Sequence, residues 1–337
     1  MIRFIILFFL CWAPFADAAL SSFAAKFEKA QDGDYIVTKQ DKTCTLIFVR
    51  AHQPFLLLEE ISVLESSVTT NWKQWLAEGA PGHTSWNLYE FDLESGKLNE
   101  AFSFSHRGWL TLGDDEQILA KLLTLPLNKV PEDKRRRIGP PPLAGESDTR
   151  KLWNPPKIFE GKTYEKSRFQ VLGGRWPQDR SLLSGCAIEM YFDAQSPFPF
   201  PFWIELSNGH YTLKLRVVDA GKGLKSPQKL GMPHRPPQFV GQMQKEDKYW
   251  RVTLKSPHYY HQFKLYALDL SKPTQPPMAV PFELIKSETA GVVTLSLDVK
   301  QLRSLLKEGH PYRWMLVPER FPDVVAESHD LFVWKNS

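Results

Sequence analysis

The chain has 337 residues, 42% of them hydrophobic and 24% charged, and this balance excludes an intrinsically disordered protein. The formal net charge of +4 is too small an excess to indicate a nucleic-acid-binding protein, and the length favours two or three domains. With 22 Phe, 11 Trp, 10 Tyr and 26 Pro, the composition favours strands and turns over helical bundles.

The first element in chain order is an export signal. A basic residue precedes an apolar run over 4–12, and an A-x-A site then ends at Ala18, which predicts cleavage before Ala19. The apolar run is about half as long as the ~20 residues of a membrane-spanning helix. Leu10 stands before Cys11 where a lipobox has Gly or Ala, which argues against lipidation. We therefore expect Sec-dependent export to the periplasm or medium, without a transmembrane segment after processing.

Residues 19–127 are predicted to form an N-terminal β-rich or α+β domain. Its expected strands are 35–39, 44–50 and 55–63, followed by a hairpin of 86–93 with 98–104 that turns at Gly96. A helix is expected to open at Asp114, with Gln117 completing a capping box, and to end at Pro126. Its apolar stripe predicts that the helix covers a sheet.

Residues 128–161 are predicted to be a basic, proline-rich linker. The densest charge run, Lys134, Arg135, Arg136 and Arg137, lies here and is followed by three consecutive prolines. Two interpretations stay open for this run. It keeps a spacer solvated, or it contacts an anionic surface such as a phosphate-bearing envelope polymer.

A middle β segment is predicted over 162–232 and a β-sandwich over 233–337. The middle segment contains an Asn208-Gly209 dipeptide between two apolar runs, which is a hairpin signal. The last hundred residues show strands at sandwich spacing, at 250–254, 263–270, 282–285, 292–297, 312–317 and 330–334. Asp298 is expected to cap one short helix there, closed by Gly309.

The stretch Leu306-Lys-Glu-Gly309-His-Pro-Tyr312-Arg-Trp314 resembles the tyrosine corner of fibronectin type III and other immunoglobulin-like domains. The resemblance covers about a third of the chain. It implies a C-terminal Ig-like sandwich, a Tyr312 hydroxyl bonded to the chain upstream, and a binding or spacing role without chemistry. The fold class expected overall is therefore mainly β, with β-sandwich material and a few short helices.

Two cysteines, Cys44 and Cys186, remain after the predicted cleavage. In an oxidising compartment the pair could form a disulfide. Both also lie in apolar strand-like runs, where buried free thiols are normal. The two outcomes stay open.

Motifs for chemistry are scarce. The sequence lacks H-E-x-x-H, C-x-x-C, G-x-S-x-G and a strand-following G-x-G-x-x-G, so we expect no cofactor and no metal. His83 and Ser85, after a Gly/Pro turn, are the one alternative catalytic pair, as base and nucleophile of a hydrolase. His234, His258 and His261 lack a carboxylate at ligand spacing and are read as loop residues.

The sequence thus predicts an exported binding or scaffolding protein of a bacterial cell envelope. Its expected partner is an envelope protein or an anionic envelope polymer, not a nucleic acid. The alternative is an envelope hydrolase that cleaves a peptide or polymer with the His83 and Ser85 loop.

Overall fold

A computed structural model describes residues 21–68, 71–113, 116–143, 145–287, 289 and 291–335. Within them the chain is mainly β, with antiparallel sheets and four short helices, so the predicted fold class is confirmed. The chain divides into two compact units. The first contains described residues up to Trp86, with Asp92–Lys97 and Leu112–Pro227, and the second contains Asn87–Phe91, Leu98–Thr111 and the described residues from Gln228. The predicted cleavage site at Ala18 and Ala19 lies outside the described residues.

A twelve-stranded antiparallel sheet runs in the order β1-β8-β11-β12-β13-β14-β2-β3-β4-β5-β6-β7. The strands are β1 (Ser21–Ser22), β2 (Tyr35–Gln40), β3 (Thr43–Ala51), β4 (Leu56–Leu64), β5 (His83–Phe91), β6 (Leu98–Ser103), β7 (Gly108–Trp109), β8 (Pro126–Lys129), β11 (Phe169–Arg175), β12 (Ala187–Asp193), β13 (Trp203–Ser207) and β14 (Thr212–Gly221). A separate pair joins β9 (Lys157–Phe159) to β10 (Lys162–Tyr164).

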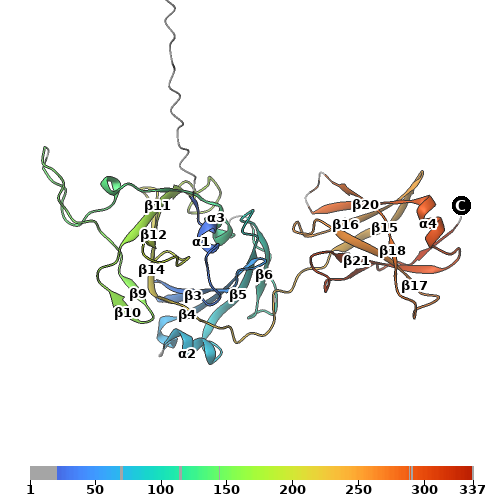
Figure 1. The fold of residues 1–337 in the computed structure, drawn as a ribbon, viewed down its shortest axis with the longest axis horizontal. Helices are drawn as coiled ribbons and strands as arrows, with labels where there is room; N and C mark the ends of the chain where they lie inside the picture. The colour runs from blue at the N-terminus through green and yellow to red at the C-terminus, as the bar shows by residue number, and fades with distance from the viewer. Residues whose placement is uncertain are drawn as a thin grey trace, which may run out of the picture. The chain divides into compact units, whose positions relative to one another are not determined.

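Three short helices accompany this sheet in the first unit: α1 (Ala24–Phe27), α2 (Trp72–Ala77) and α3 (Ile118–Thr124). The 3-10 turns are η1 (Glu65–Ser67) and η2 (Glu132–Lys134). The Asn71 side chain caps α2 by accepting the Gln74 backbone N–H at 2.8 Å. Figure 1 shows α1 and α3 beside each other, within the curve that β11, β12, β14, β3 and β4 describe.

Two predicted hairpins of the twelve-stranded sheet are confirmed. The hairpin of β5 and β6 turns at Gly96 with φ +67°, and the hairpin of β13 and β14 turns at Gly209 with φ +87°. The prediction for the start of α3 is wrong, since that helix begins at Ile118 and Gln117 is its N-cap. Gln117 supplies no side-chain cap, and its own amide instead donates to the Leu112 carbonyl at 3.3 Å.

The segments 19–127 and 162–232, treated separately in the sequence, contribute strands to one sheet. The antiparallel pairing of β14 with β2 joins them, with Ala220 opposite Ile36. The intervening residues 128–161 run from β8 to the turn after β9, with a bridge between Arg137 and Leu152, and the chain re-enters the sheet at β11. Pairing between strands so far apart in the sequence cannot be predicted from local composition.

The C-terminal part of the second unit is built from two antiparallel sheets. One has the order β15-β16-β20-β19, and the other has the order β18-β17-β21-β22, with β23 also paired to β21. Their bounds are β15 (Gln238–Glu246), β16 (Tyr249–Lys255), β17 (Phe263–Asp269), β18 (Met278–Val280), β19 (Glu283–Lys286), β20 (Val292–Asp298), β21 (Pro311–Pro318), β22 (Ala326–Glu327) and β23 (Phe332–Val333). Helix α4 (Val299–Leu305) follows β20, and the Asp298 carboxylate caps it by accepting the Lys300 N–H at 2.6 Å, as predicted.

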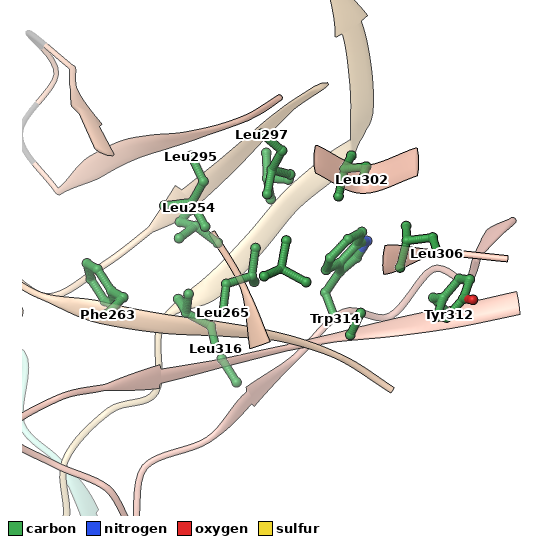
Figure 2. Packing of buried hydrophobic residues seen from close by; sticks show 14 of the residues in the cluster. Leu254, Phe263, Leu265, Leu295, Leu297, Leu302, Leu306, Tyr312, Trp314 and Leu316 are labelled. Carbon is green, nitrogen blue, oxygen red and sulfur yellow. The ribbon is translucent and has the colours of Figure 1, made fainter. Parts of the chain in front are cut away.

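Alternate residues of these strands fill one apolar core. On β21, Tyr312, Trp314 and Leu316 are each at most 2% exposed, while the residues between them are half-buried. Figure 2 shows Trp314 and Leu316 of β21 together with Leu254 of β16 and Leu295 of β20. The Tyr312 hydroxyl accepts the Lys307 backbone N–H at 2.7 Å, which is the upstream bond that the sequence resemblance implied.

Candidate functional site

An apolar cavity of the first unit has a volume of about 480 Å³. Its walls come from α1 and α3, from the concave faces of β2, β3, β4, β13 and β14, and from the loop before β13. The volume lies in the range of about 300–1,000 Å³ that is usual for small-ligand sites. This cavity is therefore the candidate functional site.

Strand periodicity places the sheet residues of the cavity. Successive side chains of a strand point to opposite faces, so Ile36 and Thr38 of β2 and Thr45 and Ile47 of β3 line the cavity together. The opposite face is sealed, since Leu46 is 0% exposed. The cavity face is less covered, because Thr38, Thr45 and Ile47 are only half-buried. One face of the sheet is thus packed core, and the other is left accessible.

The helices supply large apolar side chains to the opposite wall. Phe23, at the N-cap of α1, and Phe27 lie four positions apart, and their ring centroids are 5.2 Å from each other. Phe27 also packs edge-on against Phe200, with centroids 5.2 Å apart. On α3, Leu122 is buried, whereas Ile118 is 45% exposed although it lines the cavity. Ile118 therefore lies at the mouth.

Most polar side chains that line the cavity lie at or near the turn that joins β2 to β3, whereas Glu60 lies on β4 opposite Ile47. Thr38 donates weakly to the Thr45 carbonyl at 3.4 Å, and the Thr45 hydroxyl lies 3.3 Å from that of Ser62. Lining residues with longer polar side chains are Gln40, Asp41 and Glu60. The cavity thus combines apolar walls with a small polar region.

Such an arrangement can hold a molecule with a hydrocarbon chain and a polar end. It offers no nucleophile beside a base, and the described residues contain no cluster of three or more His, Cys, Asp or Glu side chains that could hold a metal ion. No helix among the described residues is long and apolar enough to cross a membrane.

The alternative catalytic pair, His83 and Ser85, lies at the start of β5. His83 Nδ1 lies 2.9 Å from the Ala80 carbonyl, and its ring packs edge-on against Trp86. In a triad, that ring nitrogen would face an orienting carboxylate. Ser85 lies two residues further along β5, and within the described part of the chain no contact joins it to His83. The contacts of His83 that the structure shows are thus with the Ala80 carbonyl and the Trp86 ring.

The two cysteines are free, buried thiols in this structure. Cys44 lies on β3 and Cys186 directly precedes β12, with β13, β14 and β2 between those two strands in the sheet. Neighbouring strands lie about 4.8 Å apart, whereas a disulfide needs Cα atoms within about 7 Å of each other. The disulfide considered from the sequence is therefore not formed. Burial raises the pKa of the Cys44 thiol.

Most side chains of the basic run Lys134–Arg137 make contacts within the first unit. Arg135 donates to the Asn154 side chain at 2.8 Å, Arg136 lies over the Trp153 ring at 4.8 Å, and Arg137 donates to the Arg150 carbonyl at 2.7 Å. Three of the four charges therefore hold a loop in place, and an anionic polymer as partner is not supported.

Of the three histidines that the sequence places in loops, His234 makes the contacts that define its position. His234 lies in the second unit with its Nε2 3.0 Å from Glu90 Oε2, and its ring packs against Phe321. This is an ion-pair geometry with a half-buried imidazole and a buried carboxylate.

The sequence does not predict the cavity. The apolar stripe of α3 predicts packed core, and no pattern in the sequence predicts α1. A signal was nevertheless present in β2 and β3, whose apolar residues occupy both faces although Thr38 and Thr45 interrupt one of them. The exposed Ile118 shows that the stripe of α3 only partly packs.

Comparisons with known proteins give matches of low similarity. The family model of the CT021 protein matches residues 45–165, which is about a third of the chain. The structure of the hypothetical protein CT021 from Chlamydia trachomatis is 18% identical with a TM-score of 0.46, covering 64% of this chain and 100% of that one.

Two MucB structures also match. MucB alone is 9% identical with a TM-score of 0.29, covering 90% of this chain and 96% of that one. MucB in complex with MucA(peri) is 10% identical with a TM-score of 0.28, covering 83% and 93%. No curated protein matches. None of these matches identifies an immunoglobulin-like or fibronectin type III domain, and none carries an argument about function.

Proposed function

We propose that this chain is an exported binding protein of the cell envelope whose first unit holds the hydrocarbon chain of a small amphiphile. The cavity of about 480 Å³ between α1, α3 and the sheet is the observation that supports this function. The export signal ending at Ala18 supports an extracytoplasmic location. N-terminal sequencing of protein from the envelope fraction tests the location, with Ala19 as the expected first residue.

The cavity opens to solvent beside Ile118, which is 45% exposed, so water or a ligand fills it in solution. Since its walls are mainly Phe, Leu and Ile, an apolar ligand fills it more favourably than water.

The second unit supports the wider assignment to a binding or scaffolding protein. Counted in chain order from β15, the strands of its C-terminal part group as first, second, sixth and fifth in one sheet and fourth, third, seventh and eighth in the other. This order is similar to that of an immunoglobulin-type sandwich, and Tyr312 lies near the start of β21, the seventh strand, as in a tyrosine corner. We infer an Ig-like domain over 233–337, a fold that serves mainly in recognition and spacing.

Binding of a fluorescent apolar probe, such as N-phenyl-1-naphthylamine, tests the function. We expect saturable binding that 1-dodecanoylglycerol displaces. Ile118→Asp places a charge at the cavity mouth in the first turn of α3, where an acidic residue is tolerated. It should weaken probe binding about tenfold, the equivalent of ~1.4 kcal/mol.

Ile138→Asp is the matched control, because Ile138 is 56% exposed and does not line the cavity. It should bind the probe like the wild type. The proposal fails if wild-type protein does not bind the probe, or if the two variants bind it equally well.

A further inference from the structure

The polar residues that line the cavity share one electrostatic character. Asp41 and Glu60 contribute carboxylates, while Gln40 and the threonines contribute uncharged hydrogen-bonding groups. No Lys, Arg or His occurs among the described residues that line the cavity. The polar end of a bound molecule would therefore meet negative or neutral groups.

The lysines of the two lining helices are engaged away from the cavity. Lys26 of α1 donates to Gln170 at 3.0 Å and lies 4.9 Å from the centre of the Phe192 ring. Burial lowers the pKa of Lys26. Lys121 of α3 pairs with Asp179 at 2.5 Å. Neither lysine lines the cavity, so neither helix supplies a positive charge to a bound head group.

The lysines of β2 and of the turn that follows it do not line the cavity either. Lys39 lies between Thr38 and Gln40, so it points to the other face of β2, where its amine pairs with Glu65 at 2.6 Å. Lys42 follows Asp41 in the turn and is exposed, but it does not line the cavity. Asp41 has φ +52°, which is the left-handed conformation that Asp and Asn tolerate in two-residue hairpin turns.

Resting on the proposed function, we propose that the cavity selects amphiphiles with one hydrocarbon chain and an uncharged or cationic head. Hydroxyl and amide groups can donate hydrogen bonds to the threonine and carboxylate oxygens, and a cationic head is attracted to the carboxylates by its charge. A carboxylate or phosphate head would instead approach Asp41 without a lining cation to neutralise it. Because Asp41 is exposed, the discrimination is modest and weakens as salt screens the charges.

Competition among three ligands with similar chains tests this selectivity. Dodecanoate, 1-dodecanoylglycerol and dodecyltrimethylammonium displace the naphthylamine probe from the full chain, each below its micelle-forming concentration. At low salt we expect the neutral and cationic ligands to displace the probe at about fivefold lower concentration than dodecanoate. Near 1 M salt, where the Debye length is about 3 Å, dodecyltrimethylammonium should no longer displace the probe at a lower concentration than dodecanoate does.

Asp41→Asn should strengthen dodecanoate binding by about twofold to fivefold and leave 1-dodecanoylglycerol unchanged. Asp247→Asn is a close control. Asp247 also precedes a lysine in a two-residue hairpin turn, with φ +55°, but lies in the second unit outside the cavity. It should not change the binding of any of the three ligands.

The outcomes separate the two proposals. If none of the three ligands displaces the probe, the proposed function fails. If all three bind equally well, if dodecanoate binds best, or if Asp41→Asn does not alter dodecanoate binding, the head-group selectivity is wrong while the binding function stands.

Discussion

Replacement of Ile47 by Trp blocks the cavity without disturbing the packed face of the sheet. Ile47 is half-buried on the cavity face of β3, and its neighbours Leu46 and Phe48 fill the opposite face. An indole fits a strand position well, and here it extends into open space rather than into packed core. We therefore expect the free energy of unfolding of the unliganded variant to lie within ~1 kcal/mol of the wild-type value, since no close-packed neighbour must move.

The effect of ligand distinguishes the two proteins. With free 1-dodecanoylglycerol at 100 times its dissociation constant, the wild type gains about 2.7 kcal/mol of unfolding free energy. For a unit of 150–250 residues this raises Tm by about 5–10 °C, whereas Ile47→Trp should gain about 1 °C or less. Differential scanning calorimetry measures both. Thr253→Trp, at a half-buried strand position of the second unit, should keep the full ligand shift. An equal ligand shift in Ile47→Trp and wild type would refute the cavity as the binding site.

Three further predictions concern the framework. Tyr312→Phe removes the acceptor of the Lys307 N–H and should lower the unfolding free energy of the second unit by about 1–3 kcal/mol in urea titrations, and an unchanged midpoint would contradict it. Burial raises the pKa of Glu59 above its ordinary value of 4.5, so the folded state binds a proton more tightly than the unfolded state. Stability relative to Glu59→Gln should therefore fall as pH rises from about 4.5 through the raised pKa, whereas a difference that is constant between acidic and neutral pH would show that the carboxyl is not perturbed. Thiol titration should find Cys44 and Cys186 unreactive in the native protein and both reactive in denaturant. If neither thiol reacts in denaturant without reductant, and both react after reduction, the two cysteines form a disulfide.

The strands and turns were largely predictable because their signals are local. Alternation in 312–317, the Gly96 and Gly209 turns, and the Asp298 cap all depend on residues within a few positions of each other. Even the Tyr312 contact spans only five positions. Such features follow from short-range patterns of burial and from the conformational freedom of glycine.

The candidate site was not predictable in the same way. Its walls join Phe23, Leu58, Ile118, Phe200 and Leu215, which meet only because β14 pairs with β2 and so closes a connection of about 170 residues. Nothing in the local sequence distinguishes an apolar stripe that packs against a sheet from one that faces an accessible cavity. An apolar stripe predicts close-packed core in both cases, and for this reason the cavity is not predicted from the sequence.

Calorimetric titration of the full chain with 1-dodecanoylglycerol at several temperatures tests the central claim most directly. Transfer of a hydrocarbon chain into the cavity should give one saturable site with a negative heat-capacity change, the robust marker of apolar burial, and Ile47→Trp should abolish it. Absence of binding by the wild type, or binding that Ile47→Trp leaves intact, would contradict the assignment of this cavity as the functional site.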